Sequence, residues 1–265
     1  MEGAGTKPKT TRVMGILNVT PDSFSDGGRF DDKAEAIAHA RAMIAEGADI
    51  IDIGGESTRP GHQTIDAETE KARVLPVISA IAPLGVPLSI DTMKADVAEA
   101  ALAAGASILN DVWGFQRDPR MADVAAAAGC QAIVMHNRQK ADPSIDIMED
   151  MLAFFDKTLD IARKAGVSEG NLVLDPGIGF GKTAEQSLHA MRHLSRLKAL
   201  GFPVLFGASR KSSIGHVLDK PVDQRLFGTL AVNAWAVLEH ADIIRVHDVA
   251  AHVDLVRMLD AIRKA

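Results

Sequence analysis

The chain has 265 residues, of which 47% are hydrophobic, and a formal net charge of −6. This length and composition suit one domain with a large core, and the acidic balance excludes a broad surface for nucleic acid or an anionic membrane.

The single cysteine, Cys130, excludes an internal disulfide, and no apolar run reaches the roughly 20 residues of a membrane span. Residues 1–11 are polar and lack the apolar core of a secretory signal. They predict a disordered leader and a cytoplasmic protein.

Eight short apolar runs follow in chain order, and almost every one ends on a polar or charged residue. They span residues 13–17, 50–51, 86–90, 108–109, 132–135, 172–174, 204–206 and 243–244. Ala-rich amphipathic segments lie between them, and helix-to-strand turns are marked by Gly47, Gly105, Gly129 and Gly201. This alternation predicts parallel strands joined by crossover helices. The fold class is therefore α/β, and we predict a single-domain (βα)8 TIM barrel over residues 12–265 with its site at the carboxyl ends of the strands.

Local signals place several helices along the chain. Asp31 or Asp32 is expected to cap the first helix, and the longest helical stretch runs from residue 143 to residue 166. One apolar helix face is predicted from Leu188, Met191, Leu194 and Leu197. The last helix has a similar face, made of Val249, Val253, Val256 and Leu259. Cys130 stands at the start of a predicted strand, where we expect a buried, inert thiol.

Two long loops near the amino terminus carry turn-forming residues. Residues 18–28 follow the first strand and contain one aromatic side chain, Phe24, that has no periodic partner. A loop of this length between strand and helix indicates a lid, and the alternative is a flexible connection without a function. Residues 54–61 follow the second strand, and there glycines and Arg59 suit phosphate, although many Gly-rich turns bind nothing.

Polar residues at three strand ends are expected to point into the barrel mouth. They are Asp91, Asn110 and Asp175. A buried carboxylate is costly unless it is paired, although Asp91 could instead cap a helix. Capping is awkward for Asp175, because a Gly-rich loop over residues 176–182 follows it. A ligand that offers two adjacent N–H donors would satisfy this carboxylate.

The last two strands end in basic residues. Residues 209–213 open a helix after the seventh strand, where barrel enzymes often hold anions. Arg245 and His247 lie on one side of the eighth strand and suit a diphosphate. His136 is either a structural histidine or a ligand contact. The sequence contains no nucleophile elbow, zinc spacing, Walker loop or dinucleotide fingerprint.

Taken together, residues 18–28, 54–61, 175–182, 209–212 and 244–248 closely resemble the dihydropteroate synthase family of the folate pathway. The resemblance covers residues 12–264 in order. It implies a transferase barrel in which 4-aminobenzoate displaces diphosphate from 6-hydroxymethyl-7,8-dihydropterin diphosphate, with Mg²⁺ as cofactor. It further implies a homodimer that acts on small molecules and is a target of sulfonamides.

The resemblance also assigns residues by position. The implied pterin pocket consists of Asp91, Asn110, Met135, Asp175, Gly207 and Lys211. The implied diphosphate site consists of Asn18, Thr58, Arg59, Arg245 and His247, with Asn18 as the metal ligand. The implied 4-aminobenzoate site consists of Phe24, Pro60, Phe180, Lys211 and Ser212. The catalytic residues would be Asp91, Asp175, Lys211 and Arg245.

The chain departs from the family at residues 137–140, where Asn-Arg-Gln-Lys replaces a common Met-x-Gly pattern. Two alternative functions stay open. A barrel that transfers a methyl group from a methylfolate to a corrinoid protein would not need the lid, the Lys211–Ser212 pair or a diphosphate clamp. A catalytically inactive pterin-binding barrel would be indicated by loss of Asp175, Lys211 or Arg245, and all three are present.

Overall fold

A computed structural model describes residues 10–20, 29–56 and 64–265 of the chain. Its strands form one parallel sheet in the order β6-β5-β4-β3-β2-β1-β8-β7. The strands are β1 (Arg12–Asn18), β2 (Ile50–Gly54), β3 (Leu88–Asp91), β4 (Ile108–Asp111), β5 (Gln131–Met135), β6 (Leu172–Asp175), β7 (Leu205–Phe206) and β8 (Ile243–Val246). A parallel bridge between Leu174 and Val204 joins β6 to β7, so the sheet closes into a barrel. The predicted (βα)8 fold is confirmed.

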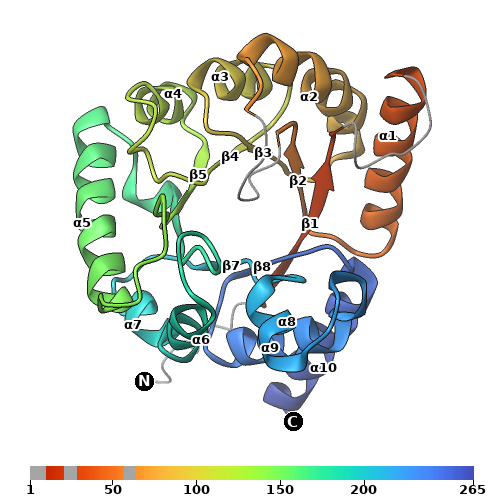
Figure 1. Ribbon diagram of the computed structural model, residues 1–265. Coiled ribbons are helices and arrows are strands. Elements are labelled where there is room, and N and C mark those ends of the chain that lie inside the picture. Colours follow the sequence, from red (N-terminus) through yellow and green to blue (C-terminus); the bar gives the residue numbers. More distant parts are fainter. Residues whose placement is uncertain (1–9, 21–28, 57–63) are drawn as a thin grey trace, which may run out of the picture.

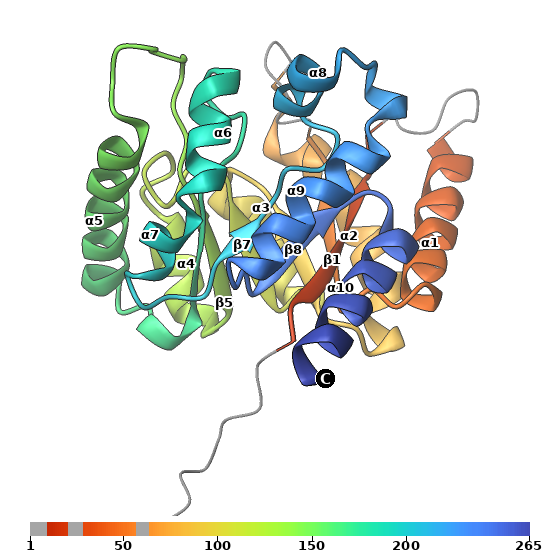
Figure 2. The same cartoon turned by 90° about the horizontal axis from the view of Figure 1, so that it is seen from below.

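The helices form a ring around this barrel (Figure 1). They are α1 (Arg29–Ala45), α2 (Ala67–Ile81), α3 (Ala95–Ala103), α4 (Met121–Ala128), α5 (Ile147–Ala165), α6 (Ala184–Arg192), α7 (Leu194–Lys198), α8 (Ser212–Leu218), α9 (Leu226–Leu238) and α10 (Val249–Lys264). Short 3₁₀ turns lie at Ala82–Leu84, Glu169–Asn171 and Val222–Gln224. In the side view α8 stands above the barrel, at the end opposite the carboxyl terminus (Figure 2).

Glycine makes the predicted helix-to-strand turns possible. The φ angles of Gly47, Gly105, Gly129 and Gly201 are 98°, 119°, 60° and 86°. These values lie in the left-handed region, which residues with a Cβ rarely adopt. The helix-to-strand turns were therefore predicted correctly. Cys130 is buried, as expected.

Two helix predictions were wrong in detail. Helix α1 already begins at Arg29, so Asp31 and Asp32 lie inside it and neither is its cap. The helix expected through Leu188 and Leu197 is two helices, because the backbone of His193 leaves helical geometry with φ −106° and ψ 27°. Leu188 is consequently 38% exposed, whereas the other three members of the predicted face are buried.

The barrel has two apolar layers. One buried cluster consists of strand residues alone: Met14, Ile50, Ile108, Ile133, Val173, Leu205 and Ile243. The other joins the opposite faces of the strands to the surrounding helices. Alternation along a strand therefore puts the first cluster inside the barrel, and we call it the floor. No helix of the described residues is long and apolar enough to cross a membrane.

The chain enters the barrel just before β1. Thr11 is buried, and its hydroxyl donates to the carbonyl of Ala241 at 2.8 Å. Residues 1–9, which make up most of the predicted leader, lie outside the described residues.

Candidate functional site

The polar residues of the candidate site lie one step above the floor. Side chains two residues apart share a face of a strand, so a residue two positions after a floor residue points into the barrel mouth. This relation joins Ile50 to Asp52, Ile108 to Asn110, Ile133 to Met135, Val173 to Asp175, Leu205 to Gly207 and Ile243 to Arg245. Strand alternation thus brings the predicted residues Asn110, Met135, Asp175, Gly207 and Arg245 to one level above the floor.

Arg245 is the centre of this layer. Its Nε donates to Asp52 Oδ2 at 2.6 Å and its Nη2 to Asp91 Oδ2 at 2.8 Å. The amide of Asn110 donates to the same Asp52 oxygen at 3.2 Å. The guanidinium therefore ties together strands β2, β3 and β8 and still has N–H groups to offer a ligand.

Asp52 is the site residue that the sequence analysis missed. Its side chain is fully buried and holds both Arg245 and Asn110. The available signal was a carboxylate inside an apolar run, between Ile51 and Ile53, where an unpaired charge would be costly.

Two carboxylate oxygens of the layer have no hydrogen-bond partner within the described residues. They are Oδ1 of Asp52 and Oδ1 of Asp91, both buried. Burial raises the pKa of Asp91 to about 7 in spite of the opposing charge of Arg245. Buried acceptors of this kind would be satisfied by the N–H groups of a ligand.

Asp175 and Lys211 form a second pair of opposite charges, close enough to Arg245 for its charge to shift the pKa of both. The backbone N–H of Gly177 donates to Asp175 Oδ1 at 2.7 Å. The ammonium group of Lys211 donates to the carbonyl of Ile178 and lies 4.5 Å from the centroid of the Phe180 ring. Burial raises the pKa of Asp175 and lowers that of Lys211 to about 8, and each charge opposes the shift of the other. Asp175 is not a helix cap; helix α6 is capped by Thr183.

An apolar wall completes the pocket. Met93, Val112 and Met135 pack in one buried cluster, with Trp113 and Phe180 against it. Thioether and aromatic groups pack well on the faces of flat rings. A flat heterocycle with N–H donors at its edge would fit between this wall and the carboxylates.

The remaining predicted residues of the described chain surround the mouth. His247 Nδ1 lies 2.9 Å from the hydroxyl of Ser209, which also accepts the backbone N–H of His247. Ser212 is the exposed first residue of α8. A Cβ built on Gly54 would lie 3.9 Å from Asn18 Oδ1 and 3.8 Å from Asp91 Oδ2, so both side chains border that glycine.

Four predicted residues, Phe24, Thr58, Arg59 and Pro60, lie outside the described residues. Their proposed roles stay predictions. His136, for which two roles were open, is fully buried, and its ring contacts Asp150 and Lys182. Asp91 does not cap helix α3, whose first turn follows Lys94.

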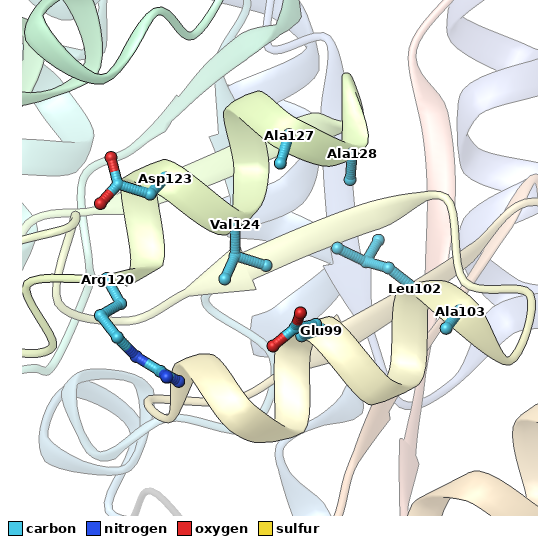
Figure 3. A pocket seen from close by; sticks show the side chains of 8 residues that line it. All are labelled: Glu99, Leu102, Ala103, Arg120, Asp123, Val124, Ala127 and Ala128. Carbon is cyan, nitrogen blue, oxygen red and sulfur yellow. The ribbon is translucent and has the colours of Figure 1, made fainter.

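Other features of the surface lack this chemistry. A groove between α3 and α4 is lined mainly by Leu102, Val124 and several alanines, with Glu99 and Arg120 at its edge (Figure 3). It lies on the helix ring and away from the floor residues. Among the described residues, no group of three or more His, Cys, Asp or Glu side chains is arranged to hold a metal ion.

Comparison with known proteins finds relatives over nearly the whole chain. Residues 14–247 match the family model of the pterin binding enzymes. A dihydropteroate synthase of Clostridium beijerinckii is 50% identical over 254 residues, which cover 95% of this chain and 94% of that protein. A dihydropteroate synthase structure from Clostridium difficile, determined in the presence of pteroic acid, superposes with a TM-score of 0.94 at 48% identity and covers 99% of both chains.

A second structure, the Xanthomonas albilineans dihydropteroate synthase with 4-aminobenzoic acid, has a TM-score of 0.93 at 40% identity. It covers 98% of this chain and 100% of that one. Fold, pocket and sequence similarity over nearly the whole length lead to one conclusion: the chain belongs to the dihydropteroate synthase family of pterin-binding enzymes.

Proposed function

We propose that this transferase joins 6-hydroxymethyl-7,8-dihydropterin diphosphate to 4-aminobenzoate, giving 7,8-dihydropteroate and diphosphate in folate biosynthesis. The observation that carries the proposal is the single layer above the floor, which contains Asp175 and Arg245 together with Asp91 and Asn110. The layer offers carboxylates to a heterocycle and a guanidinium to a polyanion. Solved relatives that hold pteroic acid or 4-aminobenzoic acid support it.

The pterin would lie against the apolar wall. Asp175 accepts from its amino group and ring N–H, and Lys211 donates to its carbonyl and ring nitrogen. Asp91 and Asn110 face its other edge, where the unpartnered Oδ1 of Asp91 takes a further N–H. The ligand then gives a partner to Asp91 Oδ1, as tight binding in a buried polar site requires.

The diphosphate would lie higher in the mouth. The N–H groups of Arg245 that Asp52 and Asp91 do not use bind its oxygens, with His247 beside them and Thr58 and Arg59 predicted to join them. The side-chain oxygen of Asn18, which borders Gly54, fits Mg²⁺, because this ion prefers hard oxygen ligands and takes most of its remaining ligands from phosphate and water. When bound, Mg²⁺ would neutralise charge on the leaving diphosphate.

In the reaction, the bond between the exocyclic methylene carbon and the diphosphate oxygen breaks, and that oxygen keeps the electron pair. The methylene carbon gains a bond to the amino nitrogen of 4-aminobenzoate, which then loses one proton. Carboxylates around the pterin stabilise positive charge on the ring as the diphosphate leaves, and Arg245 stabilises the departing charge. Phe180, Phe24, Pro60, Lys211 and Ser212 would form the site of 4-aminobenzoate, for which sulfonamides would compete.

Incubation of the purified protein with both substrates and Mg²⁺ tests the proposal. We expect release of diphosphate in a 1:1 ratio with 7,8-dihydropteroate. Pterin binding without diphosphate release would instead indicate an inactive barrel. Methyl transfer from a methylfolate to a corrinoid, without the condensation, would indicate the methyltransferase alternative.

The predicted homodimer is proposed to form through α9 and α10. These helices pack together and expose large apolar side chains, among them Phe227 at 76%, Leu238 at 53% and Ile262 at 65%. Large apolar side chains that stay exposed on neighbouring helices favour association. The acidic composition and the single cysteine support a cytoplasmic enzyme without a nucleic-acid partner.

Substitution of Phe227 and Leu238 by glutamate is expected to convert the dimer to a monomer, because each charge would be buried at the interface. Sedimentation velocity would measure the change. Replacement of Leu188, exposed on α6, serves as the control and should leave the dimer intact. Two glutamates that leave the sedimentation coefficient unchanged would contradict this interface.

A further inference from the structure

Lys182 is the buried lysine of the described chain, with 8% of its surface exposed. Its Nζ lies 2.7 Å from His136 Nδ1, 2.8 Å from the carbonyl oxygen of Gly177 and 3.1 Å from that of Phe180. The carbonyl oxygen of His136 lies farther away, at 3.4 Å. An ammonium group has three N–H donors, so the three nearer acceptors saturate it. It forms no ion pair with any described residue. Lys182 thus ties the loop after β6 to the end of β5.

The acceptor on His136 is held by a second contact. His136 Nε2 lies 3.0 Å from Asp150 Oδ2, and Arg138 Nη1 donates to the other oxygen of Asp150 at 2.5 Å. Burial and the nearby Lys182 lower the pKa of His136 to about 3, so the ring is neutral. Nε2 then carries the proton and donates to Asp150, which leaves Nδ1 free to accept from Lys182.

The two loops pack backbone against backbone around this lysine. Gly177 and Gly181 have φ angles of 60° and 55°. A side chain at Gly177 would overlap the carbonyl of His136, and one at Gly181 would overlap Arg138. Arg138 belongs to the segment in which this chain departs from the family pattern. That segment therefore forms one unit with the loop after β6.

The same loop presents its other side to the pocket. Between Asp175 and Lys182, the N–H of Gly177 holds Asp175, the carbonyl of Ile178 accepts from Lys211, and the ring of Phe180 lies beside the Lys211 ammonium group. The two carbonyls that accept from Lys182, those of Gly177 and Phe180, lie on either side of Ile178 and Gly179 in the sequence. A shift of this loop would move the groups that face both substrates.

The burial of Lys182 lowers the stability of the folded protein. Burial lowers its pKa to about 7, which means that the site disfavours the charged form that three acceptors require. A group kept at a cost in stability points to a role in function.

We propose that Lys182 is a positioning residue for the condensation: it fastens the loop of residues 176–181 to His136, so that Asp175, Lys211 and Phe180 keep the places in which they bind the two substrates. The inference rests on the proposed function. It assigns to residues 136–140 the role of supporting this loop from the side that faces away from the substrates.

The test is Lys182→Met, which keeps the length of the side chain and removes its donors. We expect a higher KM for both substrates and a fall of about 100-fold in kcat/KM, the scale of a displacement near 1 Å in a reaction site. Weaker binding of pteroic acid by calorimetry should accompany the change. The matched control is Lys198→Met, because Lys198 pairs with Asp242 at the opposite end of the barrel. It should keep the wild-type KM values even where its Tm falls.

A merely structural role would give a smaller active fraction with unchanged KM values, and this result would overturn the proposal. If Lys182→Met does not fold, His136 variants decide. His136→Asn keeps an oxygen near the position of Nδ1 and should stay closer to the wild type than His136→Leu, which offers Lys182 no acceptor. Equal KM values in those two variants would also overturn the proposal. Absence of diphosphate release by the wild-type protein would refute the proposed function instead.

Discussion

Replacement of Arg245 by methionine is expected to lower the rate of diphosphate release by about 10³-fold or more, the scale seen when a positioned donor to a developing anion is removed. The variant should also be less stable, because Asp52 and Asp91 lose the cation that both contact. Leaving a buried charge without its partner costs about 3–5 kcal/mol. Single-turnover kinetics and urea denaturation measure the two effects.

The loss of stability in Arg245→Met should depend on pH. Burial raises the pKa of Asp91 to about 7 even with Arg245 present, and without that cation the pKa rises further. A carboxyl whose pKa is higher in the folded state than in the unfolded state contributes stability at pH values below the unfolded pKa, near 4. This contribution is lost as the pH rises through the folded pKa. The deficit of the variant should therefore be smaller at pH 5 than at pH 8.

The control for this experiment is Arg210→Met. Arg210 pairs with Asp248 at a half-buried position, outside the layer of polar residues above the floor. Its stability deficit should be small and similar at both pH values. A deficit of Arg245→Met that is the same at pH 5 and pH 8 would show that the carboxylates of Asp52 and Asp91 do not depend on this cation.

Most of the barrel could be predicted because its rules are local. Left-handed glycines mark most turns into a strand, and a strand in a closed parallel barrel is buried on both faces. The polar residue at the end of such a strand has only the barrel mouth to face. Asn110 and Asp175 were expected at the mouth on this ground, and alternation from Ile108 and Val173 puts them one step above the floor. Their roles in binding stay predictions.

The rest depends on contacts that no local pattern contains. Asp52 stands inside an apolar run, and its partner Arg245 is 193 residues away. Helical periodicity could not show that the helix is interrupted at His193, because the apolar residues on both sides of it keep the same spacing. The contact of Lys182 with His136 joins two loops that are 46 residues apart. These features follow from the closure of the barrel, so they become visible only in three dimensions.

A second large effect is expected from Asp175→Asn, which should weaken pterin binding by about 2–4 kcal/mol, or roughly 30- to 1000-fold in Kd. The backbone N–H of Gly177 already donates to Asp175 Oδ1 at 2.7 Å. In the variant this N–H would select the amide oxygen, since an NH₂ group cannot accept it. The NH₂ group is then directed at the ligand, where the carboxylate offered an acceptor. Two donors would face each other in a buried site.

Calorimetry with pteroic acid measures this change, and Asp242→Asn is its matched control. Asp242 also accepts a backbone N–H, from Val204 at 2.8 Å, and also lies beside a lysine, but at the amino-terminal end of β8. Its replacement alters the same kind of contact far from the pocket, so the affinity for pteroic acid should stay at the wild-type level. If both variants bind the ligand with wild-type affinity, Asp175 does not accept hydrogen bonds from the pterin. The edge of the ring would then have to face Asp52 and Asp91, whose buried Oδ1 atoms are the other acceptors of this layer without a partner among the described residues.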